Sequence, residues 1–249
     1  MYKVLTIAGS DCSGGAGIQA DIKTITAHGM YAMSAITSLT AQNTTGVYGV
    51  MDSTPEILGK QLDCIFNDIF PDAVKIGMVN DIQIVHVIAD CIRKYSPEHI
   101  IYDPVMVSTS GRKLMTDEAI EEIKKELLPL VTLVTPNIDE AKVLTGKSIQ
   151  NTQDMLEAAK QLSDSYQTHI LIKGGHLEGD QMCDLLYSPD HTYYIYEEKK
   201  IESKNLHGTG CTLSSAIASY LAKGYSMKES IRHAQEYITH AIIAGKVLN

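Results

Sequence analysis

The chain lacks an excess of positive charge. Its 249 residues include 21 Lys and Arg against 30 Asp and Glu, a formal net charge of −9. A general nucleic-acid binder or membrane-surface binder needs the opposite balance, so neither kind of partner is expected. A small anionic ligand remains compatible with this charge, because loop amides bind phosphate without net positive charge.

Paired cysteines and long apolar runs are also missing. The five cysteines are scattered, odd in number and without C-x-x-C or zinc spacing: Cys12, Cys64, Cys91, Cys183 and Cys211. Free thiols in a reducing cytoplasm are the simplest interpretation. The N-terminus runs straight into a predicted strand without a signal-peptide core, and no apolar run approaches the ~20 residues that span a bilayer. We therefore expect a cytoplasmic protein.

What the chain does have is a regular alternation of strands and helices. Strands are predicted at 4–8, 33–41, 47–51, 73–78, 99–102, 131–135, 170–173, 182–187 and 192–196, with apolar helical stripes between most of them. Ser53 with Glu56, and Ser226 with Glu229, have the spacing of capping boxes. This order predicts an α/β fold with a mostly parallel sheet and helices on both faces. No repeat, linker or low-complexity segment interrupts it, so residues 1–249 are predicted to form a single domain.

In such sheets ligands bind beyond the carboxyl ends of the strands. Polar or glycine-rich segments fall at these ends: 9–17, 42–43, 78, 103–111, 137–140, 173–176 and 208–211. The glycine loop at 9–17 lacks both G-x-G-x-x-G and G-K-[ST], so it is weak evidence for phosphate binding by itself. One edge of the sheet is nevertheless expected to gather most of the unusual chemistry.

The segment at 208–211 is the most informative of these. Gly208 and Gly210 permit a tight turn, and a helical stripe begins just after them, so Thr209 and its neighbours should lie at a helix N-terminus that can hold phosphate. Cys211 would lie in the first turn, where the same field favours thiolate over thiol. The alternative is a glycine loop that caps a core helix, with Cys211 buried as a small apolar residue.

A kinase also needs a metal site and contacts for phosphate and for the acceptor. Asn137 and Glu140 can help to hold Mg²⁺, or they are an ordinary N-cap and a solvated helix residue. Lys173 either reaches a phosphate or is a solvent-facing strand end. Cys211 is the candidate for assisting the attacking hydroxyl, or it simply contacts the substrate.

Three further residues have two interpretations each. Gln42 offers an amide that can both donate to and accept from a heteroaromatic edge, or it makes a turn hydrogen bond. Asp21 faces either solvent or the pocket. Met78 forms the wall of an apolar pocket or packs in the core.

Several motifs together resemble a known family. They are 8–11 with 13–21 (AGSD and SGGAGIQAD), 40–44 (TAQNT), 75–78 (KIGM), 103–106 (DPVM), 135–137 with 140–141 (TPN and EA), 173–176 (KGGH) and 207–212 (HGTGCT). In this order and over nearly the whole length, the chain resembles the hydroxymethylpyrimidine and hydroxymethylpyrimidine-phosphate kinases of thiamine biosynthesis, within the ribokinase-like superfamily. Leu206 departs from the threonine usual in that family.

The resemblance implies ATP-dependent phosphorylation of 4-amino-5-hydroxymethyl-2-methylpyrimidine and then of its monophosphate. It implies Mg²⁺, a ribokinase-like sheet with a small lid or none, and a homodimer. Gln42 would bind the pyrimidine in a pocket lined by Gly9, Ala16, Asp21, Met78 and Val105. Asn137, Glu140 and Lys173 would hold Mg·ATP, and Gly208, Thr209 and Gly210 would form the anion hole. Cys211 would act in catalysis, under a flap at 107–113.

Two other functions fit parts of the pattern. A pyridoxine or pyridoxal kinase of the same superfamily would act on a similar methylated nitrogen heterocycle with a hydroxymethyl arm. A non-catalytic protein that senses a pyrimidine would bind the ligand without releasing ADP. The presence of Glu140 and Cys211 favours an enzyme.

Overall fold

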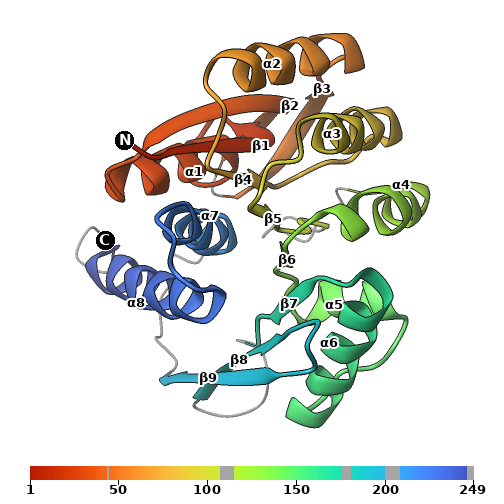
Figure 1. Ribbon diagram of the computed structural model, residues 1–249, viewed down its shortest axis with the longest axis vertical. Helices are drawn as coiled ribbons and strands as arrows, with labels where there is room; N and C mark the ends of the chain where they lie inside the picture. Colours follow the sequence, from red (N-terminus) through yellow and green to blue (C-terminus); the bar gives the residue numbers. More distant parts are fainter. Residues whose placement is uncertain (44, 107–114, 175–180, 200–207, 246–249) are drawn as a thin grey trace.

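The computed structural model describes residues 1–43, 45–106, 115–174, 181–199 and 208–245. These residues form one nine-stranded sheet in the order β3-β2-β1-β4-β5-β6-β7-β8-β9 (Figure 1). The strands are β1 (Lys3–Asp11), β2 (Tyr31–Asn43), β3 (Gly46–Asp52), β4 (Ala73–Ile76), β5 (Ile100–Tyr102), β6 (Leu133–Val134), β7 (His169–Ile172), β8 (Gln181–Tyr187) and β9 (Tyr193–Lys199). Strands from β2 to β7 in this order run parallel, whereas β3, β8 and β9 pair antiparallel at the two edges.

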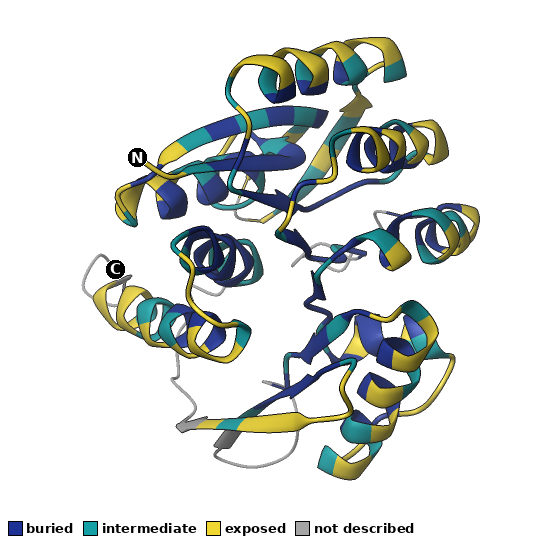
Figure 2. Cartoon of the chain, viewed as in Figure 1, coloured by how far each residue is buried: buried dark blue, intermediate teal, exposed yellow. Residues whose placement is uncertain are grey.

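Helices cover both faces of the sheet, as predicted (Figure 1). One face carries α1 (Gly17–Ala27), α7 (Thr209–Ala222) and α8 (Met227–Gly245). The other carries α2 (Pro55–Asp68), α3 (Ile82–Tyr95), α4 (Asp117–Glu122), α5 (Ile138–Thr145) and α6 (Thr152–Tyr166), with a π-helical turn at Ile123–Leu127 and a 3₁₀ turn at Leu128–Leu130. The apolar core accordingly consists of two layers, and the strands between them are buried on both sides (Figure 2).

Helix starts follow the sequence signals with one exception. The predicted capping box at Ser226 with Glu229 is present. Asn137 is the N-cap of α5, which was one of its two interpretations, and it forms with Glu140 a capping box that was not predicted. At α2, however, the N-cap is Thr54, whose side chain accepts from the Ile57 amide. Ser53 instead donates its hydroxyl hydrogen to the Ile36 carbonyl oxygen, because it still lies beside β2.

The chain order creates a switch point in the sheet. The next strand in the chain, β2, pairs with β1 on one side. The strand β4, which follows later, pairs with β1 on the other side. The crevice at the carboxyl ends of β1 and β4 is where ligands bind in sheets of this kind. Among the described residues, no helix is long and apolar enough to cross a membrane, and all five cysteines are free.

Candidate active site

The turn before α7 lies against the glycine loop that follows β1. Gly208 is the N-cap of α7 with φ +80°, a left-handed conformation in which glycine is favoured. A Cβ at this position would overlap the carbonyl oxygen of Gly15. The two loops are almost 200 residues apart in sequence, and their backbones are in direct contact here. A side chain at position 208 would push them apart.

The glycine loop is itself organised by Asp11, which the sequence analysis assigned no role. Its carboxylate accepts from the Ser13 amide (2.8 Å), the Ser13 hydroxyl (2.7 Å), the Gly15 amide (3.0 Å) and the Ala16 amide (2.8 Å). Burial opposes ionisation, but these donors and the Gln42 side chain lower the pKa of Asp11 to about 2. Because a carboxylate only accepts, this contact turns the amide nitrogen of Gln42 toward Asp11.

The predicted pocket residues around this loop lie close together. A Cβ at Gly9 would be 2.8 Å from the Met78 Cε, and one at Gly17 would overlap the Gly9 carbonyl oxygen. The Cys12 thiol donates to the Gln42 carbonyl oxygen at 3.1 Å. Met78 is 8% exposed, and its role as a wall of the pocket stays a prediction.

A second group of polar residues lies on the other side of the 208–211 turn. A Cβ at Gly210 would be 3.4 Å from Lys173 Nζ and 3.5 Å from Asp103 Oδ2. Lys173 Nζ is 2.9 Å from Asp103 Oδ1, which also accepts from Thr135 Oγ1 at 3.0 Å. Burial opposes the ionised form of Asp103, but Lys173 and Lys75 outweigh it and lower the pKa of Asp103. The sequence analysis quoted Asp103 only as part of a motif and missed this role.

Asn137 and Glu140 form the start of α5 beside this group. The Asn137 side chain accepts from the Glu140 amide at 2.9 Å, and Glu140 Oε2 accepts from the Asn137 amide at 2.8 Å. Glu140 is nevertheless only 7% exposed, so it is not a solvated helix residue. Burial raises the pKa of Glu140 to about 7, Asp103 adds to the rise and Lys173 opposes it. A buried carboxylate with so high a pKa is stabilised by an added cation.

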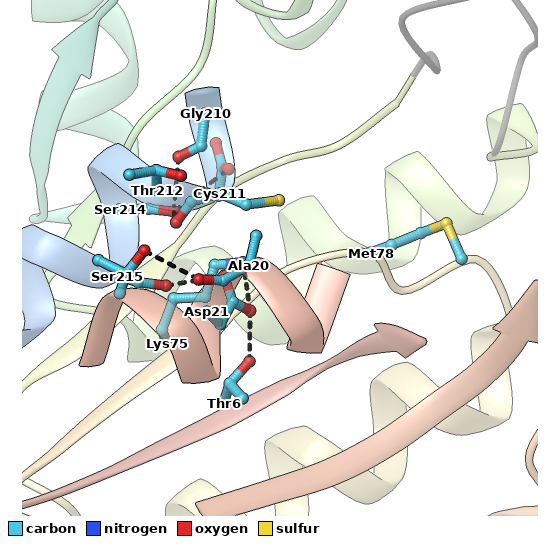
Figure 3. A network of polar contacts seen from close by, with 12 residues as sticks. Thr6, Ala20, Asp21, Lys75, Met78, Gly210, Cys211, Thr212, Ser214 and Ser215 are labelled. Carbon is cyan, nitrogen blue, oxygen red and sulfur yellow. Dashed lines mark hydrogen bonds and ion pairs between the residues drawn. The ribbon is translucent and has the colours of Figure 1, made fainter. Parts of the chain in front are cut away.

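Cys211 differs from its prediction. Burial is the largest cause that raises the pKa of its thiol to about 11; Lys75 and the Gly17 amide lower it, and Asp21 and Asp103 raise it further. The expectation of a thiolate at this position was therefore wrong, because burial favours the neutral thiol. The sulfur points away from Ser214 and Ser215, toward the side on which Met78 lies (Figure 3).

Asp21 and Val105 complete the predicted set. Asp21 is fully buried, and both of its carboxylate oxygens accept from protein donors: Thr6, Lys75 and Ser215. Asp21 therefore does not face solvent, which was one of its two interpretations. Its contact with the substrate stays a prediction. Val105 is half-buried, two residues beyond Asp103, whose carbonyl oxygen accepts from its amide. The predicted flap at 107–113 and Leu206 lie outside the described residues.

The arrangement can bring two ligands together at one helix N-terminus. Gly208 lies against Gly15 and Ala16 of the glycine loop, and Gly210 lies near Lys173 and Asp103. Asn137, the N-cap of α5, forms a β-bridge with Lys173. The described residues include no cluster of three or more His, Cys, Asp or Glu suited to a metal. A Mg²⁺ ion does not require such a cluster, because it is usually held by one or two carboxylates and otherwise keeps water and phosphate ligands.

Comparisons with known proteins identify relatives over nearly the full length. Residues 11–249 match the family model described as phosphomethylpyrimidine kinase. A hydroxymethylpyrimidine/phosphomethylpyrimidine kinase of Rhizobium meliloti is 45% identical, over 97% of this chain and 90% of that protein. A thiamine biosynthesis bifunctional protein of Geobacter sulfurreducens is 46% identical over 96% of this chain, which spans only 49% of that longer protein.

Two solved structures share the fold. The crystal structure of a phosphomethylpyrimidine kinase from Clostridium difficile superposes with a TM-score of 0.87 at 45% identity, covering 97% of this chain and 100% of the other. A pyridoxal kinase from Staphylococcus aureus in complex with AMP-PCP gives a TM-score of 0.89 at 35% identity, covering 97% and 88%. The predicted ribokinase-like fold is confirmed.

Proposed function

The chain belongs to the phosphomethylpyrimidine kinase family, and from this premise we propose that it phosphorylates 4-amino-5-hydroxymethyl-2-methylpyrimidine, and then its monophosphate, with ATP. It is a phosphotransferase of thiamine biosynthesis, in keeping with the names of its relatives. The observation that carries the site assignment is the contact of Gly208 with Gly15 on one side and of Gly210 with Lys173 and Asp103 on the other. Residues 1–249 act together as one kinase domain.

The pyrimidine binds on the side of the glycine loop. The residues that line its pocket are Gly9, Ala16, Asp21, Met78 and Val105. Gln42 recognises the edge of the ring. Because Asp11 accepts from the Gln42 amide nitrogen, the Gln42 amide oxygen is oriented to accept from the exocyclic amine of the ring. The hydroxymethyl oxygen then lies near the N-terminus of α7.

Mg·ATP binds on the other side of the turn. Asn137 and Glu140 orient the metal-bound phosphates, and Lys173 lies near them as a point charge. When held near Glu140 and Asn137, Mg²⁺ would neutralise negative charge on the transferred phosphate. Lys173 is only partly exposed and already paired with Asp103, so its position is fixed before the nucleotide arrives.

The γ-phosphoryl group transfers in line to the hydroxymethyl oxygen. The amides of Gly208, Thr209 and Gly210, with the field of α7, hold the migrating group where its charge develops. Cys211 assists the hydroxyl as a neutral thiol in the resting enzyme, since the pKa of about 11 keeps it protonated at neutral pH. A loose transition state needs little proton removal before the new bond forms, so a resting thiolate is not required.

A pyridoxal kinase is the second candidate, because the Staphylococcus aureus relative with that name shares the fold at a TM-score of 0.89. Turnover of ATP measured separately with the hydroxymethylpyrimidine and with pyridoxal tests the choice. We expect a higher kcat/KM for the pyrimidine. A strong preference for pyridoxal would overturn the assignment, and binding without ADP release would instead identify a sensor.

We also propose a homodimer in the cytoplasm. Within the described ranges the edge strand β3 pairs only with β2, and Tyr48 (69%), Met51 (63%) and Leu39 (45%) expose apolar surface there. Five free cysteines suit a reducing compartment. Light scattering should give twice the chain mass for the wild type and the monomer mass for Tyr48→Glu; a monomeric wild type would exclude the dimer.

A further inference from the structure

Lys75 is among the largest fully buried side chains of the described residues. Its Nζ lies 2.9 Å from Asp21 Oδ2 and 3.0 Å from Oδ1, and neither side chain is exposed (Figure 3). Asp21 also accepts from Thr6 Oγ1 at 2.6 Å and from Ser215 Oγ at 2.7 Å. The cluster therefore connects β1, α1, β4 and α7.

The ammonium of Lys75 extends toward the carboxyl end of β4. Residues two apart on an extended chain share one face, and Gly77 follows Lys75 by two. A Cβ at Gly77 would lie 2.8 Å from Lys75 Nζ. Gly77 thus leaves room for the charged group, which lies on the side of the sheet edge where the site is built.

The hydrogen bond from Ser215 connects this ion pair to the anion-binding turn. Ser215 follows Cys211 by four residues, so the two lie on one side of α7, one turn apart. Fixing Ser215 to Asp21 fixes the rotation of the helix about its axis. That rotation decides where Cys211 and the first amides of α7 point.

Stability alone does not explain a pair of this kind. Withdrawing two charges from water costs several kcal/mol per ion, and apolar replacements of buried pairs are often equally stable. Lys75 stays charged here: burial opposes it, but Asp21, the Cys211 thiol and Asp103 raise the pKa of Lys75 well above its ordinary range. A permanent positive charge therefore lies near the thiol.

We propose that Lys75, held by Asp21, is a positioning residue for phosphoryl transfer, which supports the first turns of α7 and supplies the positive field beneath Cys211. The effect on turnover rests on the proposed kinase function. The effect on the thiol does not, because it can be measured without substrates.

The first test follows alkylation of Cys211 by iodoacetamide against pH in the intact protein. Peptide masses separate Cys211 from the exposed Cys12 and Cys64. Lys75→Met removes the positive charge that favours the thiolate of Cys211, so alkylation at pH 8 should be about tenfold slower. Asp21→Asn removes a negative charge that disfavours the thiolate, so alkylation should be faster. Opposite responses support the proposal. Equal responses, or faster alkylation in both variants as from a loosened helix, overturn it.

The second test measures turnover. In Lys75→Met we expect kcat to fall about 10- to 100-fold, the loss typical of groups that orient others, with KM for ATP and pyrimidine nearly unchanged. Lys94→Met is the matched control, because its ion pair with Asp63 is exposed and far from the site; its kcat should stay at the wild-type value. An unchanged kcat in Lys75→Met overturns the proposal.

A third variant covers the case in which Lys75→Met does not fold. Ser215→Ala keeps every charge and only removes the hydrogen bond from α7 to Asp21, so it should fold. Its kcat should fall several-fold while the alkylation profile of Cys211 shifts little. A wild-type kcat in folded Ser215→Ala would overturn the claim that the hydrogen bond to Asp21 positions α7 for turnover. A wild type without turnover would refute the kinase function instead, whereas the thiol test would still report on Lys75.

Discussion

Replacing Glu140 with Gln should make the protein more stable above pH 7 while it removes activity. Glu140 is 7% exposed, and its Oε2 accepts from the Asn137 amide. Gln has nearly the same shape and keeps an acceptor for that hydrogen bond. The substitution therefore isolates the negative charge, which Asp103 disfavours and which Lys173 and the amides of Asn137 and Met106 favour.

The magnitude follows from the pKa. Burial raises the pKa of Glu140 from its ordinary 4.5 to about 7, so the folded protein holds the proton more tightly than the unfolded chain. The stability from this group is fully present below pH 4.5 and is lost as the pH rises through 7. A shift of roughly 2.5 units corresponds to about 3 kcal/mol. The pKa of about 7 already includes the attraction to Lys173. We therefore expect Glu140→Gln to exceed the wild type by about 1 to 3 kcal/mol at pH 8.

Urea unfolding at pH 5 and pH 8 measures this difference. The gain should be small at pH 5, where the wild-type carboxyl is mostly protonated, and large at pH 8. Activity with Mg·ATP should fall at both values, because the variant lacks the carboxylate for the metal. Such a separation of stability from activity is typical of functional sites.

Glu229→Gln is the matched control. Glu229 also closes a capping box, with Ser226, but it is exposed, and its hydrogen bonds lower its pKa. Its replacement should therefore lower stability slightly and leave activity unchanged. The reasoning is refuted if Glu140→Gln is less stable than the wild type at pH 8, or if its stability difference is the same at both pH values.

Three further predictions concern the helix N-terminus and the pocket. Cys211→Ala should fold and lose about 100-fold in kcat, and a near-native kcat would exclude a role for the thiol in assisting the hydroxyl. Gly208→Ala should lower the free energy of unfolding by more than 1 kcal/mol, because it adds an overlap with Gly15 to the strain of φ +80°; Gly224→Ala, with φ +86° and nothing within 4 Å, is its control, and equal losses in urea unfolding would contradict the contact. Gln42→Ala should lower kcat/KM for the pyrimidine by about 10- to 100-fold and leave KM for ATP unchanged; an equal rise in both KM values would argue against ring recognition.

Much of the fold could be predicted because its signals are local. Apolar periodicity located the strands and helices, and the Ser226 capping box marked one helix start correctly. The interpretation of Asn137 as an N-cap marked another. The N-cap of α2 was predicted one residue early, since Ser53 and Thr54 both satisfy the local rule and only the position of β2 decides between them. The glycine turn before α7 was also recognisable from its spacing.

The electrostatics of the site could not be predicted in the same way. The thiol of Cys211 responds to Lys75, Asp21 and Asp103, which are far from it in sequence. The Lys75–Asp21 pair spans 54 residues and the Asp103–Lys173 pair spans 70. Helix position alone suggested a thiolate, whereas burial and two carboxylates decide the outcome. Such contacts become visible only once the strands have a known order.

Product masses after incubation of the purified protein with 4-amino-5-hydroxymethyl-2-methylpyrimidine and Mg·ATP test the central assignment most directly. The account predicts a product with one added phosphate that is followed by one with two, with one ADP released for each phosphate. An unmodified pyrimidine in a preparation that phosphorylates pyridoxal, or that binds the pyrimidine without forming ADP, would contradict it.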